Sequence, residues 1–279
     1  MNALLFTAVV WAISVVAGFL GSLTGLGGGV IIIPVLTLAL GVDMKYAMGA
    51  TLISVIATSS GAAAAYVREG FTNIRIGMFL EIATTAGAVA GAFLAGRVST
   101  HALAVIFGLV LIQSAWQSVA RGYEAGAAPV PSDALARRLR IGGSYPVDGE
   151  ERAYGVRNVP AGFGIMFGAG ALSGLLGIGS GALKVVAMDR AMKIPFKVST
   201  TTSNFMIGVT AAASAGVYLK HGFIDPGLAM PVVLGVLAGA LLGSKLLVRV
   251  PARTLRLVFA AVVLALAVEM IVNGIMGRV

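Results

Sequence analysis

The sequence predicts an all-α polytopic membrane protein built from two homologous repeats of about four membrane spans each. The 279 residues are 58% hydrophobic and only 11% charged, whereas soluble domains carry about 25% charged residues. The mean hydropathy is +0.97, and apolar stretches of membrane-spanning length recur along the chain. A similar pattern of glycine, aromatic and basic residues also appears twice. A chain this apolar cannot cover a globular surface with polar groups, so lipid must cover it.

Composition also excludes several classes of function. The chain has no cysteine, which rules out disulfides, thiolate metal sites and thiol catalysis. With two histidines and no H-E-x-x-H spacing, we expect no metal and no cofactor. The net charge of +9 agrees with basic loops on anionic lipid, or with an anionic substrate. No polar domain carries this charge, so we expect no nucleic-acid binding.

The first repeat is predicted over residues 1–120 and begins with a retained membrane helix at residues 3–20. No basic region precedes this stretch, unlike a secretory signal peptide. The glycine-rich run 21–29 breaks the helix, and residues 30–40 are only half a span long, which indicates a short helix of the re-entrant type. Further spans are predicted at residues 46–67, 74–96 and 101–119. The middle one carries Gly87 and Gly91, whose spacing lets helices approach closely.

Residues 121–158 are predicted to form a soluble linker, because they contain six Arg, five acidic residues and three Pro with little hydrophobic periodicity. A short helix is expected at residues 132–140, where Ser132 and Asp133 could cap it. The second repeat then covers residues 159–279. Its predicted parts are a span at 161–176, a break at 177–181, a short helix to Met192, and spans at 198–219, 223–248 and 252–273.

The two repeats align without a gap when 152 is added to each residue number. Lys45 then matches Lys197, Tyr66 matches Tyr218, and Arg97 matches Arg249. Matches among Ala, Gly and Val arise by chance in any apolar chain, but matching Lys, Tyr and Arg in one register indicate an internal duplication. If the short helices do not cross the membrane, the repeats are parallel; if they cross, each half has an odd number of spans and the repeats are inverted. Loop charge does not decide between these topologies.

The glycine runs have three interpretations. A nucleotide-binding P-loop needs a Lys after the glycines in a soluble α/β unit, and neither run provides it. A ladder of small residues at Gly21, Gly25 and Gly29 could serve helix packing alone. Three consecutive glycines exceed what packing needs, because each costs about 1 kcal/mol in a helix interior. A break that frees backbone N–H groups at the start of a short helix would instead create an anion site.

Hydroxyl groups follow each short helix. Thr51 and Ser54 occur in the first half, and the run Thr200-Thr201-Thr202-Ser203-Asn204 occurs in the second. A single membrane hydroxyl often bonds only to its own helix carbonyls. Five consecutive polar residues cannot all do so on a lipid face, so we expect them to cap the helix or line a polar path.

Charges inside predicted membrane segments are functional candidates. Glu81 is a candidate proton-coupling carboxylate, or a partner within the bundle. Lys184 is a candidate substrate contact, although its counterpart in the first half is Ile32. Asp189 and Arg190 are candidates for specificity, or form a pair at an interface. These four residues are the possible coupling or specificity positions.

The motif Gly21-x-x-x-Gly25-x-Gly27-Gly28-Gly29-x-x-x-x-Pro34, followed by Ala50-Thr51, resembles the sulfite exporter TauE/SafE family. The second half repeats the resemblance with Gly177-x-Gly179-x-Gly181 and Thr202-Ser203-Asn204. The resemblance implies a permease that moves sulfite, sulfonates or related anions outward. By position, it implies a substrate region made of Gly25, Gly27, Gly28, Gly29, Thr51, Gly177, Gly179, Ser180, Gly181, Thr202, Ser203 and Asn204. Ser180 in place of a glycine and Val186 in place of a proline depart from the family pattern.

We therefore expect a multi-pass plasma-membrane transporter that exports a small oxyanion by alternating access, driven by an ion gradient with the proton as coupling ion. Two other functions fit the same residues: a non-transporting membrane subunit for assembly or partner binding, and an anion channel. An enzyme is disfavoured, because no Ser-His-Asp, Cys-His or metal cluster stands out.

Overall fold

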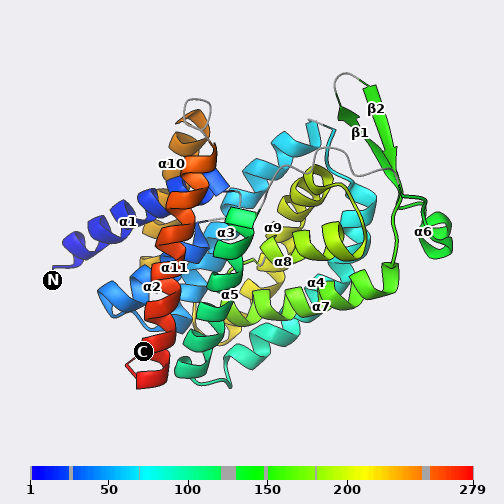
Figure 1. Ribbon diagram of the computed structural model, residues 1–279. Helices are drawn as coiled ribbons and strands as arrows, with labels where there is room; N and C mark the ends of the chain where they lie inside the picture. Colours follow the sequence, from blue (N-terminus) through cyan, green and yellow to red (C-terminus); the bar gives the residue numbers. More distant parts are fainter. Residues whose placement is uncertain are drawn as a thin grey trace.

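The computed structural model describes residues 2–24, 28–68, 70–120, 130–147, 150–179, 181–246 and 252–278. Within these residues, eight helices have 18 or more residues (Figure 1). They are α1 (Ala3–Thr24), α3 (Met44–Arg68), α4 (Ile74–Ala95), α5 (Thr100–Ala120), α7 (Val159–Leu176), α9 (Phe196–Lys220), α10 (Pro226–Leu246) and α11 (Ala252–Met276). Two short helical segments follow the glycine-rich stretches: α2 (Gly29–Leu40), and α8 (Gly181–Val186) continued by the π-helix η1 (Ala187–Ala191).

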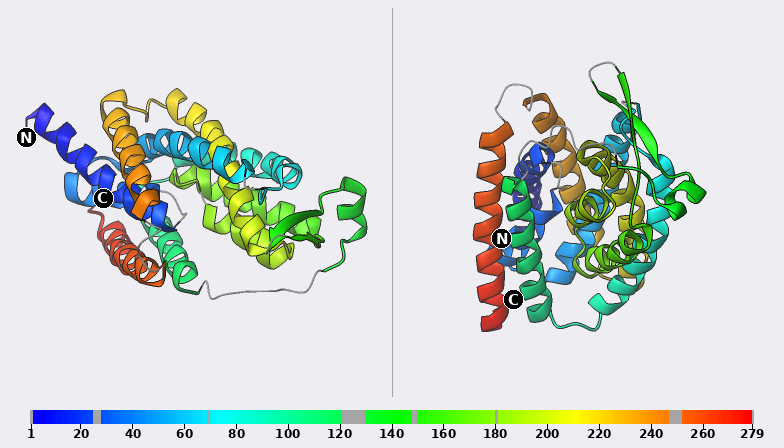
Figure 2. Two further views of the ribbon diagram at one scale, coloured as in Figure 1. Left: turned by 90° about the horizontal axis from the view of Figure 1, so that it is seen from above. Right: turned by 45° about the vertical axis from the view of Figure 1, so that its right-hand side comes forward.

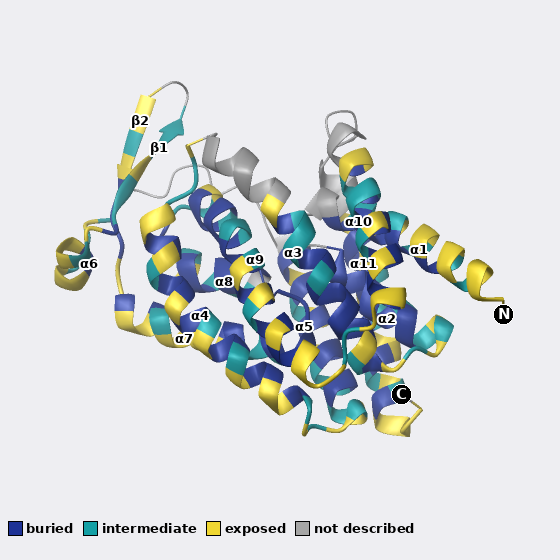
Figure 3. Cartoon of the chain, turned by 180° about the vertical axis from the view of Figure 1, so that it is seen from behind, coloured by how far each residue is buried: buried dark blue, intermediate teal, exposed yellow. Residues whose placement is uncertain are grey.

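The helices confirm a polytopic α-helical membrane protein. In the described part of the chain, six helices are long and apolar enough to cross a membrane: α1, α4, α5, α7, α10 and α11. The outer faces of these helices carry many exposed residues (Figure 3). Large apolar side chains are among them, such as Trp116 at 70% exposed and Ile275 at 73% exposed. Only lipid can cover so many exposed apolar groups without a large free-energy cost.

Helices α3 and α9, which carry the hydroxyl-rich segments, are not among these six and pack against each other inside the bundle (Figures 1 and 2). They run in opposite directions. Near the start of α3, the Met48 sulfur accepts a hydrogen bond from Tyr218 Oη near the end of α9, at 3.6 Å. Further along α3, Ser59 lies against Gly208 in the middle of α9. Most of their hydroxyl groups are thereby buried, whereas Ser60 is exposed.

Glycines bring the surrounding helices together at close range. A Cβ atom at Gly87 or Gly91 would collide with the carbonyl oxygens of Phe167 or Ala171, so α4 and α7 pack backbone to backbone. This contact confirms the close helix approach predicted from the spacing of Gly87 and Gly91. Helices α1 and α10 pack in the same way, with Gly239 against the carbonyl of Val15.

Two predicted boundaries were wrong. Helix α1 continues through Gly21 to Thr24, because a buried glycine can stay helical where neighbouring helices support it. Helix α10 begins at Pro226 and not at residue 223, because Asp225 accepts a hydrogen bond from the backbone N–H of Gly227, at 2.9 Å. The short helix in the second half changes from α to π geometry at Ala187.

The linker folds and docks onto one end of the bundle. It contains α6 (Ala134–Leu139), which Asp133 caps as predicted by accepting from the backbone N–H of Ala136, at 2.7 Å. The all-α prediction missed a β-hairpin made of β1 (Gly143–Val147) and β2 (Glu150–Tyr154), which pair antiparallel with Gly143 opposite Tyr154. The hairpin has few β-branched residues and no regular alternation, so its pattern gave no strand signal.

Two glycines of α7 provide a matched test of the close packing. Gly170→Ala would place a Cβ against the carbonyl of Thr84, whereas Gly168→Ala adds a methyl group in open space. We expect Gly170→Ala to lower the free energy of unfolding by about 1–3 kcal/mol through overpacking. Gly168→Ala is expected to leave it unchanged, or to raise it by up to about 1 kcal/mol. Thermal unfolding in detergent measures both; equal melting temperatures for the two variants would contradict the close α4–α7 contact.

Candidate functional site

The second glycine break lies between α3 and α9. Helix α7 ends at Leu176, and the chain turns through left-handed conformations at Gly177 (φ +69°) and Gly179 (φ +70°) before α8 begins at Gly181. Residues with a side chain rarely adopt these backbone angles, which explains why glycine occupies both positions. A Cβ at Gly179 would lie 2.9 Å from Ile207 Cγ2 and 3.2 Å from Val55 Cγ1. The break therefore touches both central helices, and these belong to different halves of the chain.

The first break reaches the same place. Gly28 packs against α1, where a Cβ would lie 3.3 Å from the Ala17 carbonyl oxygen. Gly29 begins α2 directly against the side chain of Thr51, and a Cβ there would lie 3.7 Å from Val55 Cγ2. Val55 therefore lies within reach of both breaks. The predicted site residues Gly25, Gly27 and Ser180 lie outside the described residues.

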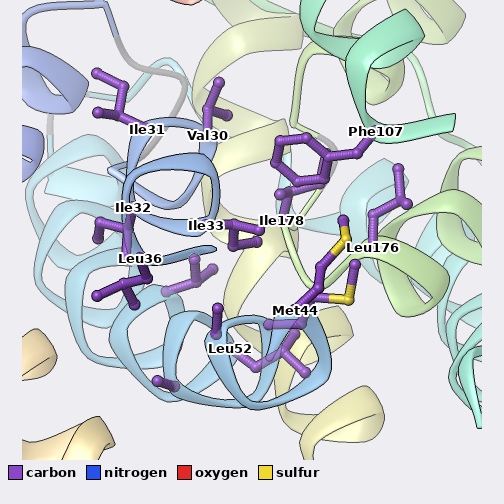
Figure 4. Packing of buried hydrophobic residues seen from close by; sticks show 14 of the residues in the cluster. Val30, Ile31, Ile32, Ile33, Leu36, Met44, Leu52, Phe107, Leu176 and Ile178 are labelled. Carbon is purple, nitrogen blue, oxygen red and sulfur yellow. The ribbon is translucent and has the colours of Figure 1, made fainter. Parts of the chain in front are cut away.

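The surroundings of both breaks are apolar. Ile178, in the second break, shares a buried cluster with Ile33 of α2, Met44 of α3 and Phe107 of α5 (Figure 4). Polar backbone groups at a helix break in such surroundings need partners, because an unpaired buried group costs free energy. One N–H is satisfied locally, since Gly177 donates to the Ser173 carbonyl at 2.8 Å.

The hydroxyl run at the start of α9 is already engaged with protein. Thr200 bonds back to the Phe196 carbonyl, and Thr201 donates to carbonyls of its own helix or of Phe71. Thr202 accepts from the backbone N–H of Asn73 at 3.1 Å, and Ser203 donates to the Gly181 carbonyl at 3.0 Å. This run therefore joins α9 to the neighbouring elements, and Asn204 is half-buried beside it.

Two hydroxyls of α3 are buried without a hydrogen-bond partner among the described residues, as is Ser173 near the end of α7. Thr51 is 0% exposed, and its Oγ1 has no hydrogen-bond partner among the described residues. Ser54, one turn further along α3, is also buried with an unpartnered Oγ. Buried polar atoms are usually hydrogen-bonded, so two such groups beside a helix break need an explanation. They can donate to a ligand that enters there.

Glu81 and Lys184, far apart in sequence, meet in the structure. Thr210 of α9 donates to Glu81 Oε1 at 2.7 Å and accepts a hydrogen bond from Lys184 Nζ. Lys184 is 0% exposed and Glu81 is 6% exposed, and Thr85 also donates to Glu81 Oε1 at 3.1 Å. The two charges are thus linked through one hydroxyl. Asp189 is half-buried and Arg190 exposed in η1, away from this cluster along the chain.

Sequence reasoning missed two residues of this region. Thr210 was one threonine among many, and nothing in its spacing showed that it would bridge two charges. Asn73 looked like a loop residue, yet it caps α4 by accepting from the Ile76 N–H and donates to the Ile141 carbonyl and Tyr154 Oη. Burial raises the pKa of the Tyr154 phenol, with the Asn73 hydrogen bond acting in the opposite direction. Asn73 thereby ties the linker to the hydroxyl run of α9.

Broken helices that meet inside an apolar bundle, beside buried hydroxyls and charges, are typical of polytopic membrane transporters. The comparison with protein families agrees with this class. The family model described as sulfite exporter TauE/SafE matches residues 10–270, and the chain belongs to this family. The resemblance found in the glycine motifs is thereby confirmed, and the family is named for transport and not for an enzymatic reaction.

The curated relatives of the chain are also named as membrane transporters. The chain is 27% identical over 270 residues to the probable membrane transporter protein YunE of Bacillus subtilis (strain 168), covering 94% of this chain and 96% of the relative. It is 25% identical over 258 residues to a probable membrane transporter protein of Xylella fastidiosa (strain 9a5c), covering 91% and 90%. No solved structure matches the chain. The protein is a membrane transporter.

The bridge at Thr210 can be tested through stability. Thr210→Val removes the one hydroxyl that, among the described residues, links Glu81 to Lys184, and it leaves both charges short of a partner. We expect the free energy of unfolding to fall by about 1–3 kcal/mol, the usual cost of unpaired buried polar groups. Thr210→Ser keeps the hydroxyl and should retain most of the stability. Thermal unfolding of both variants in detergent measures this, and a Val variant as stable as the Ser variant would show that the bridge is dispensable.

Proposed function

We propose that this protein transports a small oxyanion, such as sulfite or an organosulfonate, across the plasma membrane by alternating access driven by an ion gradient. The observation that carries the proposal is the meeting of two glycine breaks at Val55, beside the unpartnered hydroxyls of Thr51 and Ser54. The membership of the TauE/SafE family supports the anion class, and its description as a sulfite exporter supports outward movement.

The proposed architecture has two duplicated membrane halves, residues 1–120 and 159–279, joined by a linker at 121–158. Helix boundaries support the duplication: α3 and α9 both have 25 residues, and they begin at Met44 and Phe196, 152 positions apart. Close contacts support it as well. Gly18 packs against the Val236 carbonyl, and the positions 152 later and earlier, Gly170 and Thr84, make the same contact.

The direction of the central helices favours inverted over parallel repeats. Lys45, at the start of α3, lies over the ring of Phe223 beyond the end of α9, with Nζ 5.5 Å from the centroid. Lys197, at the start of α9, lies over the ring of Phe71 beyond the end of α3, at 3.5 Å. Equivalent helices that run antiparallel are related by an axis perpendicular to them. With α3 and α9 placed across the membrane, as the predicted spans 46–67 and 198–219 have them, that axis lies in the membrane plane, as in inverted-repeat transporters.

We place the anion site where the breaks meet, with Gly28, Gly29, Thr51, Gly177, Gly179 and Gly181 around it. Ser54 is an addition to the residues expected from sequence. Thr202 and Ser203 act mainly by fixing the start of α9, since their oxygens already bond to Asn73 and Gly181. Neutral hydroxyl and backbone donors suit an anion that must be released, because they bind less tightly than fixed, unpaired charge. Rocking of one half against the other would open this site to each side in turn.

Thr51→Val tests the site with a near-isosteric change. The variant loses only a hydroxyl that has no described partner, so its thermal stability should be unchanged or higher. A hydrogen bond to a charged group is worth about 1.5–3 kcal/mol, so the affinity for sulfite should fall by about ten- to a hundred-fold. Sulfite flux into proteoliposomes at several concentrations measures the change in half-saturation.

Thr58→Val is the matched control. Thr58 lies on the same helix, but its hydroxyl bonds back to the Ser54 carbonyl at 3.0 Å. This variant should transport sulfite like the unaltered protein. The proposed function would be refuted if vesicles with the unaltered protein showed no more saturable flux of sulfite and of methanesulfonate than protein-free vesicles. Unchanged half-saturation in Thr51→Val would refute only the placement of the site.

A further inference from the structure

Two opposite charges are buried close to the second glycine break. Lys184 follows Gly181 by three residues on α8, about one helical turn. Thr210, which links Lys184 to Glu81, lies three residues beyond Ile207, and a Cβ at Gly181 would lie 2.6 Å from Ile207 Cδ1. The charged cluster of Glu81, Thr210 and Lys184 is therefore a direct neighbour of the proposed anion site.

Lys184 has N–H donors without acceptors in this cluster, and Glu81 has a carboxylate oxygen without a donor there. Lys184 Nζ has three N–H donors, and the described residues provide one acceptor, Thr210 Oγ1. Glu81 Oε1 accepts from Thr210 and Thr85, but the buried Oε2 has no donor among the described residues. Two N–H groups can therefore still bind an anion, and one carboxylate oxygen can still take a proton.

Other charges are remote from Glu81. Helix α7, which packs along α4, has no charged residue between Val159 and Leu176. On α4 itself, Arg75 is exposed in the first turn and donates to the Arg140 carbonyl. The remaining charged groups of the elements packed around the cluster are Lys45 and Arg68 at opposite ends of α3, Lys197 and Lys220 at opposite ends of α9, and Asp189 and Arg190 in η1. Glu81 and Lys184 thus balance each other inside the bundle.

We infer that Lys184 binds the transported anion and that Glu81 competes with it, so that each anion binds together with one proton on Glu81. This inference rests on the proposed function and deepens it. In the empty cluster, the Glu81 carboxylate neutralises the Lys184 ammonium through Thr210. When a proton from solvent binds the carboxylate, Glu81 becomes neutral, and the ammonium N–H groups donate to the anion instead.

The exchange keeps the cluster electrically neutral in both states. A carboxylate and an ammonium sum to zero, as do a protonated carboxyl, an ammonium and a monovalent anion. This matters because an uncompensated buried charge is expensive. Proton and anion then cross the membrane together, so the sum of their two gradients drives the flux, and the anion moves outward when that sum points outward.

The test uses methanesulfonate, which stays monovalent across the working pH range, so only the protein titrates. Isothermal titration calorimetry on the purified full-length protein should show affinity rising toward acid pH by up to about tenfold per pH unit, the limit for one linked proton. Glu81→Gln mimics the protonated carboxyl. It should bind at neutral pH at least as tightly as the unaltered protein does at acid pH, and its affinity should no longer depend on pH.

The double variant Glu81→Gln/Lys184→Met removes both charges, so it leaves no unpaired buried ion and is expected to fold. It should unfold at a temperature close to that of the unaltered protein and lose methanesulfonate binding by more than a hundredfold. The controls are Glu269→Gln on α11 and Lys220→Met on α9, which remove exposed charges of the same kinds. Both should retain the affinity and the pH dependence of the unaltered protein.

Two results would overturn the inference while leaving the proposed function intact. One is a Glu81→Gln variant that keeps the full pH dependence of binding. The other is a double variant that binds methanesulfonate as tightly as the unaltered protein, which would mean that the pair only holds α4, α8 and α9 together. Failure of the unaltered protein to bind methanesulfonate or sulfite at any pH would instead refute the proposed function itself.

Discussion

The antiparallel contact between α3 and α9 is the interaction on which the rest of the structure depends. Both glycine breaks pack against it through Val55 and Ile207, and the hydroxyl-rich faces of the two helices are kept inside the bundle by it. The apolar helices around this pair provide the surface that lipid covers. A polar element can persist in a membrane only where protein surrounds it, and here the surrounding protein is also what creates a candidate site.

Two kinds of contact hold the helices of this fold together: close backbone contacts at glycines, and hydrogen bonds between buried polar side chains. Gly87, Gly91 and Gly170 let α4 and α7 touch along their backbones, and α4 also packs against α9, where Glu81 meets Thr210. The two halves are not equivalent at this level. The first half provides unpartnered hydroxyls at Thr51 and Ser54, and the second provides the ammonium of Lys184.

The polar linker is hydrogen-bonded to the helix bundle although it lies outside the predicted membrane segments. Asn73 holds the hairpin through Tyr154 and the start of α9 through Thr202, so it couples the folded linker to the hydroxyl run. The capped helix α6 could be predicted, because an N-cap is a local interaction between residues three positions apart. The hairpin could not be predicted, because contacts with Asn73 at the start of α4 support it where local propensity does not.

The sequence by itself determined the membrane class, the positions of most helices, and the family, because hydropathy, helix length and glycine motifs are local properties of the chain. It also singled out Glu81, Lys184, Thr51 and both glycine runs as unusual residues for a membrane interior. Only the tertiary structure decided which of them meet. Glu81 and Lys184 are 103 positions apart in sequence, and their contact through Thr210 depends on how α4, α8 and α9 pack. The hydroxyls of residues 200–203 were expected to cap the helix or line a polar path, with Thr202 and Ser203 in the substrate region, and they prove to be hydrogen-bonded within the protein. Partners from distant segments cannot be read from a linear pattern.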